Sequence, residues 1–120
     1  MRLRLALVAL LCATASCRDI TAAGTASVYV ILTPKVGSAA CLNADPEPAA
    51  VRVNRGISFV NKSSVQITLV LRDDHVPLVA VAPDDTSRAV KFSEPGIYHY
   101  YSQGCGASTT ELHTLSVTIN

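Results

Sequence analysis

Tryptophan is missing from this chain, and its only methionine is Met1. A thioether ligand for a metal is therefore excluded at every later position. Neither sign of charge dominates, since ten Lys+Arg face nine Asp+Glu. This balance excludes the basic stripe of nucleic-acid-binding proteins, so no nucleic-acid partner is expected. No uncharged apolar run approaches the roughly 20 residues that a spanning helix needs, and we expect no transmembrane helix in the mature protein.

The amino-terminal residues have the layout of a secretory signal peptide. Basic Arg2 and Arg4 precede an uncharged apolar run from Leu5 to Ala13, and small residues follow it. We predict that residues 1–16 form this signal and are removed. A cleaved signal implies export, so the mature protein is expected on the periplasmic or extracellular side of a membrane.

Two processing routes remain open at the end of this signal. Ala13-Thr14-Ala15 fits an ordinary A-x-A cleavage site, which would leave a secreted protein with Cys17 as a spare thiol. Thr14-Ala15-Ser16-Cys17 resembles a bacterial lipobox, although Thr14 stands where Leu is usual. The lipobox predicts that Cys17 is lipidated and anchors the protein to the membrane. Residues 17–25 would then form a flexible tether, and residues 26–120 one folded domain.

Cysteine usage fits an exported protein. Cys12 leaves with the signal and Cys17 is the lipidation candidate, so only Cys41 and Cys105 remain in the folded body. A disulfide is the default for such a pair in an oxidising compartment. We predict that it joins the loop after the first strand to the loop before the last, and closing so long a loop would stabilise the fold by about 4 kcal/mol.

Strand patterns dominate the rest of the chain. Apolar and polar residues alternate in Val65–Leu71 and in His113–Ile119, which is typical of half-buried strands. Six further short apolar runs follow turn-forming Gly, Pro and Asn residues: Ser27–Thr33, Ala50–Val53, Ile57–Asn61, Leu78–Val81, Arg88–Phe92 and Ile97–Ser102. No helical period competes with them. The pattern predicts an all-β, Greek-key β-sandwich or barrel of about seven to eight strands.

Two stretches resemble the cupredoxin family, whose members include plastocyanin and azurin. In that family a Pro-Gly or Lys-Gly turn precedes Gly-x-Tyr-x-Tyr/Phe-Tyr-Cys, and the Cys thiolate binds copper. This chain reads Pro95-Gly96-Ile97-Tyr98-His99-Tyr100-Tyr101-Ser102. Arg55-Gly56-Ile57-Ser58-Phe59-Val60-Asn61 is similar to the family's Gly-Asp-Thr-Val-x-Phe/Trp-x-Asn element. The resemblance spans Arg55 to Ser102 and implies a cupredoxin-like sandwich.

The same resemblance implies that the type-1 copper ligands are missing. Such a site needs two His, one Cys thiolate and usually a weak axial Met. Ser102 stands in the Cys position, and its neutral hydroxyl is no substitute for a thiolate. The first His position corresponds to Gln66 or Ile67, and the second lies near Cys105. His113 lies near the Met position. We therefore predict no type-1 copper and no other cofactor.

Three histidines are the remaining candidates for copper binding. By strand alternation, His99 is expected to be exposed while Tyr98 points inward. His75 follows Asp73-Asp74 in a predicted polar loop, and His113 begins the last predicted strand. His113 is the best placed of the three for a ligand. No nucleophile motif accompanies them, so catalysis is not expected.

These inferences predict an exported, lipid-anchored binding or structural module of the cell envelope, built on a copper-less cupredoxin-like domain. Its partners would be the membrane, through the lipid, and an envelope protein. The alternative is a periplasmic copper-binding or electron-transfer-related protein that uses a histidine site of another type.

Overall fold

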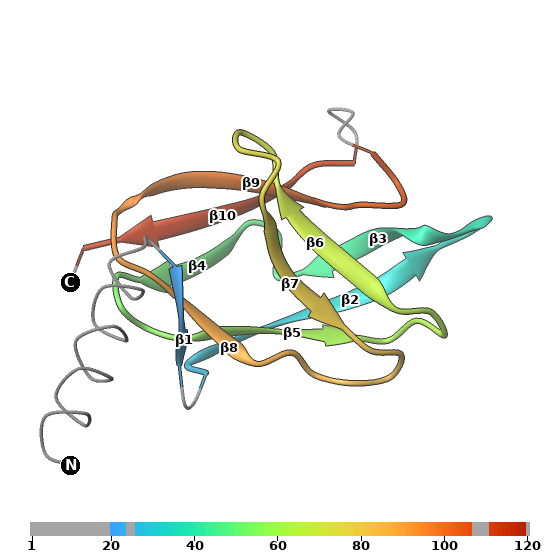
Figure 1. The fold of residues 1–120 in the computed structure, drawn as a ribbon, viewed down its shortest axis with the longest axis horizontal. Helices are drawn as coiled ribbons and strands as arrows, with labels where there is room; N and C mark the ends of the chain where they lie inside the picture. The colour runs from blue at the N-terminus through green and yellow to red at the C-terminus, as the bar shows by residue number, and fades with distance from the viewer. Residues whose placement is uncertain (1–19, 24–25, 107–110, 120) are drawn as a thin grey trace, which may run out of the picture.

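The computed structural model describes residues 20–23, 26–106 and 111–119, which form a β-sandwich (Figure 1). The described residues contain ten strands: β1 (Ile20–Ala23), β2 (Val28–Lys35), β3 (Ser38–Asp45), β4 (Ala49–Arg52), β5 (Ile57–Asn61), β6 (Ile67–Leu71), β7 (Pro77–Val81), β8 (Ala89–Phe92), β9 (Gly96–Ser102) and β10 (His113–Thr118).

The strands form two five-stranded sheets, arranged as two layers (Figure 1). Sheet I has the order β1-β8-β5-β2-β3, and sheet II has the order β4-β10-β9-β6-β7. The pairs β2–β5 and β4–β10 are parallel, whereas the other paired strands run antiparallel. The all-β sandwich predicted from the sequence is thereby confirmed.

The hydrophobic core lies between the two sheets, because alternate residues of a strand turn to the same face. In β10, His113, Leu115 and Val117 are buried, while the residues between them are only half-buried. Phe59 of sheet I meets Tyr100 of sheet II edge to face, with ring centroids 5.4 Å apart. Both rings are fully buried, and this geometry is favourable for an aromatic pair.

Asn61, at the end of β5, is fully buried and ties the two sheets together. Its amide nitrogen donates to the carbonyl oxygens of Val65, Val81 and Ala82 at 2.8, 3.1 and 3.1 Å. Its Oδ1 accepts from the backbone N–H and the hydroxyl of Ser63 at 2.9 and 2.7 Å. Because every polar atom of the side chain is satisfied, burial costs little. Asn61 thus has a structural role in the loop between β5 and β6.

One strand was not expected from the sequence. β1 lies within residues 17–25, which the sequence analysis assigned to a flexible tether, yet Ile20 to Ala23 pair with β8 in sheet I. Without β1, β8 would be an edge strand with unpaired backbone N–H and C=O groups. Another strand can pair with these backbone groups almost regardless of its own side chains. The tether expectation is therefore wrong for residues 20–23. Residues 1–16 and Cys17 lie outside the described residues.

A second unexpected strand, β3, completes a hairpin with β2. The turn uses Gly37 at φ +86°, a backbone conformation that glycine adopts without steric cost. Ser38, Ala39 and Ala40 begin β3, and their small side chains have no strand-forming signature. The described residues therefore contain ten strands rather than the predicted seven to eight, and Cys41 lies in a strand rather than in the predicted loop.

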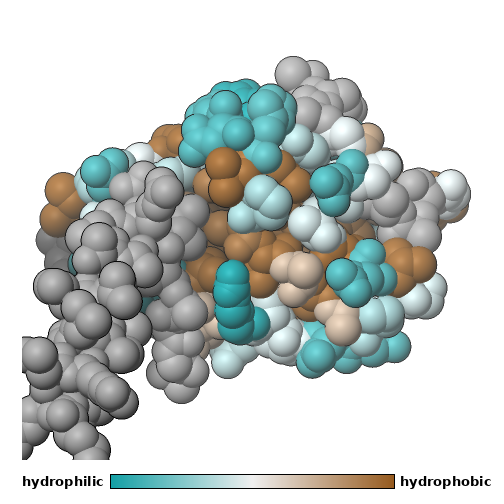
Figure 2. Space-filling view, in the orientation of Figure 1, coloured by the Kyte–Doolittle hydropathy of each residue, from teal (hydrophilic) through white to brown (hydrophobic). Residues whose placement is uncertain are grey.

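On the face that Figure 2 shows, hydrophobic side chains appear in the middle and hydrophilic ones surround them. The hydrophobic area lies around β7, in the middle of the sandwich as Figure 1 draws it. β7 of sheet II contacts β5 of sheet I. No helix among the described residues is long and apolar enough to cross a bilayer.

Candidate functional site

Ser102 ends β9 at the end of the sandwich that holds the disulfide, which we call the disulfide end. Its side chain is buried, at 4% exposure, and its carbonyl oxygen accepts from the backbone N–H groups of Cys105 and Gly106 at 2.9 and 3.2 Å. These bonds form a tight turn after β9. Ser102 therefore occupies the family's Cys position as a small, neutral, structural residue.

The positions expected for the first histidine ligand are also unsuitable. Ile67 is buried in the core at the start of β6, and Gln66 is exposed just before it. Neither side chain offers an imidazole, and the aliphatic side chain of Ile67 offers no ligand atom at all.

The predicted disulfide between Cys41 and Cys105 is confirmed. It joins β3, at the edge of sheet I, to the turn that follows β9 in sheet II, and the two Cα atoms are 4.9 Å apart. Cys105 lies near the position of the family's second His. Its sulfur is committed to a covalent cross-link between the sheets.

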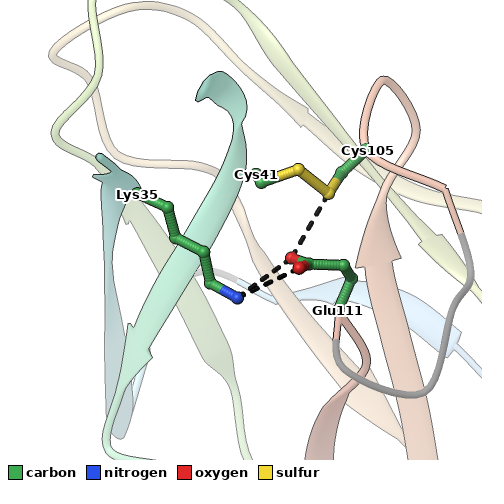
Figure 3. Close-up of a disulfide and its surroundings, with 4 residues drawn as sticks. All are labelled: Lys35, Cys41, Cys105 and Glu111. Carbon is green, nitrogen blue, oxygen red and sulfur yellow. Dashed lines mark hydrogen bonds and ion pairs between the residues drawn. A yellow bond between two sulfur atoms is a disulfide. The ribbon is translucent and has the colours of Figure 1, made fainter. Parts of the chain in front are cut away.

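An ion pair lies directly beside this disulfide (Figure 3). The Lys35 ammonium donates to both carboxylate oxygens of Glu111, at 3.2 and 3.0 Å. The Glu111 Oε2 atom also lies 3.3 Å from the Sγ atom of Cys105. A disulfide sulfur carries no hydrogen, so this approach is a contact and not a hydrogen bond in the oxidised form. Both charged side chains are partly buried, with 33% and 20% exposure.

His113 makes the second charged contact at the disulfide end. Its ring is buried, and its Nδ1 atom lies 2.6 Å from Oε1 of Glu47. The other oxygen of Glu47 accepts the backbone N–H of Thr114 at 2.7 Å. Because a carboxylate only accepts hydrogen bonds, Nδ1 carries the proton that it donates to Glu47. Glu47 thereby orients the imidazole.

Tyr100 packs against this histidine on the core side. The two ring centroids are 5.2 Å apart. Tyr100 is fully buried, and its hydroxyl is the one buried side-chain polar atom of the described residues that lacks a hydrogen-bond partner. Burial raises the pKa of Tyr100, and the negative charge of Glu47 raises it further. The phenol is therefore neutral, and its uncharged ring packs against His113.

A shallow groove of about 410 Å³ runs over the disulfide end. Both ionic pairs reach it, since Lys35, Glu47 and His113 line it together with the strand and loop residues Leu42, Asn43, Ala44, Pro48, Leu112 and Thr114. The lining mixes opposite charges, amide and aliphatic groups. Such a surface suits a polar ligand or a protein segment better than a purely apolar one.

The other two histidines do not join His113. His75 is exposed, and its Nδ1 atom lies 3.0 Å from the hydroxyl of Tyr101. His99 is half-buried rather than exposed as predicted, and its Nδ1 atom is 3.4 Å from Oγ1 of Thr114, its cross-strand neighbour in β10. In the described part of the chain, three possible metal ligands of different residues come together only at Cys41, Cys105 and Glu111.

Sequence reasoning found the cysteine pair and His113 but missed the residues that give this end its chemistry. Lys35, Glu47 and Glu111 lie in unremarkable segments and meet their partners across 66 to 76 residues of chain. No local pattern signals such contacts. The Pro residues on both sides of Glu47 mark a turn, but they do not say what the carboxylate binds.

No protein-family model and no curated protein matches this sequence. Solved structures do match: the purple cupredoxin from Nitrosopumilus maritimus has 14% identity and a TM-score of 0.57, covering 77% of this chain and 100% of that one. Oxidised plastocyanin from Dryopteris crassirhizoma has 18% identity and a TM-score of 0.54, covering 75% and 99%. A reduced amicyanin variant has 14% identity and a TM-score of 0.57, covering 83% and 99%. The chain has the cupredoxin fold.

The cupredoxin fold raises the question of whether the residues present fit a type-1 copper ion. The donor set answers it, because the positions compared with the copper ligands supply a buried hydroxyl at Ser102, a disulfide sulfur at Cys105 and one imidazole at His113. A type-1 centre depends on a thiolate together with two imidazoles. The disulfide end of this cupredoxin-fold domain therefore does not fit that centre.

Proposed function

We propose that this protein is an exported, lipid-anchored binding module of the cell envelope, with a cupredoxin fold and no type-1 copper. The observation that carries the proposal is the chemistry of the disulfide end. The positions that would ligate copper hold a buried serine and a cross-linked cysteine, and at the same end a polar groove is lined by Lys35, Glu47 and His113, which belong to two ionic pairs. We therefore assign the groove at the disulfide end as the binding surface.

The position of β1 supports anchoring at the opposite end. Ile20 pairs with Phe92, and in Figure 1 β1 lies toward the side of the sandwich where β10 ends, whereas the turn after β9 lies at the opposite side. Cys17 precedes Ile20 by three residues, which span at most about 10 Å. A lipid on Cys17 would hold this end close to the membrane. The groove at the disulfide end would then face away from it, toward an envelope protein.

Copper binding at His113 is the second candidate function, in a copper-binding or electron-transfer-related protein. It is favoured by one observation, the 2.6 Å contact between Nδ1 of His113 and Glu47. A carboxylate on one ring nitrogen is the usual way of orienting a metal-binding imidazole. We propose no catalytic activity, since no hydroxyl or thiol of the described residues bonds to His113.

Membrane fractionation tests the anchoring. We expect the natural protein in the membrane fraction, because a diacylglyceryl group and an acyl chain together supply the two anchors that stable attachment needs. Cys17→Ser should move the domain to the soluble fraction. Cys12→Ser, which changes a residue of the predicted signal, is the matched control and should leave it in the membrane. A natural protein that is already soluble and begins at Ser16 would contradict the anchoring.

A photo-crosslinking residue tests the binding surface. Introduced at Asn43, which lines the groove, it should yield a covalent adduct with an envelope protein in intact cells. Ser93 is exposed in the turn between β8 and β9, away from the groove, and is the control position. Equal labelling from both positions, or none from Asn43, would argue against the groove as the binding surface.

Copper titration separates the two candidate functions. For the binding module we expect no blue-copper absorption band and no change in Tm with Cu(II). A site filled at 100 times its Kd would add about 2.7 kcal/mol to the free energy of unfolding, which raises the Tm of a domain of this size by several degrees. A rise of that kind, lost in His113→Ala, would instead establish the copper-binding function.

A further inference from the structure

We propose that the cysteines of the Cys41–Cys105 disulfide, once reduced, bind a zinc ion together with the carboxylate of Glu111. The site would take a thiophilic divalent cation that the oxidised protein does not bind. The zinc site goes beyond the proposed function and does not depend on it. The three residues form one cluster regardless of the protein's binding partner or its anchoring.

The three donors already form one cluster, in which the two sulfurs are bonded to each other. The two Sγ atoms and one Glu111 carboxylate oxygen are all within 4.8 Å of one another, and all three residues are half-buried. Tetrahedral zinc with bonds of about 2.3 Å to sulfur and about 2.1 Å to oxygen places its ligands roughly 3.6 to 3.8 Å apart. The 3.3 Å between Oε2 and the Sγ of Cys105 is close to that spacing.

The backbone allows the two sulfurs to separate without unfolding the site. The Cα atoms of Cys41 and Cys105 are 4.9 Å apart. Rotation about the two Cα–Cβ bonds moves each sulfur while the backbone of β3 and of the turn after β9 stays in place. Sulfur ligands about 3.8 Å apart on one zinc ion are therefore compatible with the observed backbone.

Glu111 is placed for the reduced form rather than the oxidised one. Against a disulfide its carboxylate has no proton to accept from Cys105, although the two groups touch (Figure 3). A thiol at that position would donate an S–H hydrogen bond to it, and a bound cation would make it a ligand. Glu111 therefore interacts directly with Cys105 in the dithiol form, through a hydrogen bond, and in the zinc-bound form, through the metal. In the disulfide form the two groups only touch.

Lys35 supplies the charge that such a site needs. Two thiolates and one carboxylate carry three negative charges, which the zinc ion and the Lys35 ammonium balance between them. The ammonium is 3.0 Å from Glu111 Oε2, so it holds the carboxylate beside the sulfur. A nearby cation also favours the thiolate form of a cysteine. Mixed thiolate and carboxylate donors suit zinc, which accepts both ligand types.

The chemistry requires a reductant, and a dithiol is the class that supplies it. The disulfide takes two electrons and two protons from the dithiol, which becomes a disulfide itself. The two cysteine thiols then lose their protons to solvent as their sulfurs bind zinc. Water completes the fourth position on the exposed side. The metal would again connect β3 to the turn after β9, so either state joins the two sheets.

Calorimetric titration of the mature protein with Zn²⁺ tests the proposal. After reduction with a phosphine and removal of the reductant, we expect one zinc per chain and a proton release that shows in buffers of different ionisation enthalpy. The oxidised protein should bind none. Loss of even an outer partner of a metal ligand costs about 10- to 100-fold in affinity, so Glu111→Gln should weaken binding at least about tenfold. Glu94→Gln changes an exposed carboxylate outside the cluster and should leave affinity unchanged.

The Cys41→Ser, Cys105→Ser double variant separates binding from folding. It lacks both thiols and the cross-link, so circular dichroism shows whether the uncross-linked domain folds. If the reduced protein is unfolded, zinc should refold it and should not refold the double variant. The proposal is overturned if reduced protein binds zinc no more tightly than the double variant, or if Glu111→Gln binds it as tightly as the natural chain.

Discussion

Replacement of Tyr100 by phenylalanine should make this protein more stable. The phenol ring is fully buried between Phe59 and His113, and its hydroxyl has no hydrogen-bond partner among the described residues. On folding, this hydroxyl loses its hydrogen bonds to water and gains none from the described residues. Tyr100→Phe removes the unsatisfied group and keeps the ring that packs the core.

The magnitude follows from two opposing contributions. A buried polar group without a partner costs about 1–3 kcal/mol. The space left by one oxygen atom costs less than the roughly 1 kcal/mol of a methyl-sized gap. The free energy of unfolding should therefore rise by about 1 kcal/mol, which corresponds to about 4–8 °C in Tm for a domain of this size.

Alkaline pH provides an independent test of the same residue. Burial and the charge of Glu47 raise the pKa of Tyr100 above its ordinary 10.0. Above pH 10 the unfolded chain releases this proton and the folded chain keeps it, so stability is full below pH 10 and falls as pH rises. The slope attributable to Tyr100 is at most about 1.4 kcal/mol per pH unit. Tyr100→Phe should flatten the curve by that amount.

Chemical denaturation at pH 7 and across pH 9–11.5 measures both effects. The matched control is Tyr101→Phe, which removes the hydroxyl that contacts Nδ1 of His75 at 3.0 Å. That variant should lose about 0.5–1.5 kcal/mol, the net value of one hydrogen bond. If Tyr100→Phe is instead destabilised by 1 kcal/mol or more, then its hydroxyl has a partner, such as a buried water, and the reasoning is refuted.

Three further changes test the other structural contacts. Replacing Cys41 and Cys105 by alanine opens a loop with a sequence separation of 64 and should lower the free energy of unfolding by about 4 kcal/mol in denaturant titrations; an unchanged midpoint would refute the cross-link. Asn61→Ala removes the hydrogen bonds from its amide to three carbonyl oxygens and should cost about 3 kcal/mol, and a loss below 1 kcal/mol would contradict its linking role. Glu47→Ala should cost about 1–3 kcal/mol by unpairing buried His113, with Glu47→Gln recovering part of it, and equal losses in both variants would count against the hydrogen bond.

Much of the fold could be predicted from local patterns. Alternation at period two identified most of the strands, because a half-buried strand must turn every second side chain to the core. The sequence from Pro95 to Ser102 was enough to indicate the cupredoxin arrangement and the missing thiolate. The disulfide was predictable as well, since two cysteines in the folded body of a chain with a predicted export signal have few alternatives.

The two strands that the sequence did not predict, β1 and β3, show what local patterns cannot predict. β1 and β3 consist largely of small and polar residues, and they are strands because β8 and β2 offer them backbone hydrogen-bonding groups. Edge pairing depends on the position of the neighbouring strand and little on side chains. No window of the sequence from Ile20 to Ala23 contains that information.

The sequence by itself determined the sandwich, its cysteine pair and the absence of a type-1 ligand set, since these depend on the order and type of neighbouring residues. Only the tertiary structure decided what surrounds the cysteines and His113. Lys35 meets Glu111, and Glu47 meets His113, across long separations in the chain, and Glu111 in turn contacts Cys105. Such contacts arise when two sheets pack and bring their ends together. The pairing and burial of the charged side chains at the disulfide end are therefore set by how the two sheets pack. The local sequence around each of these residues does not predict them.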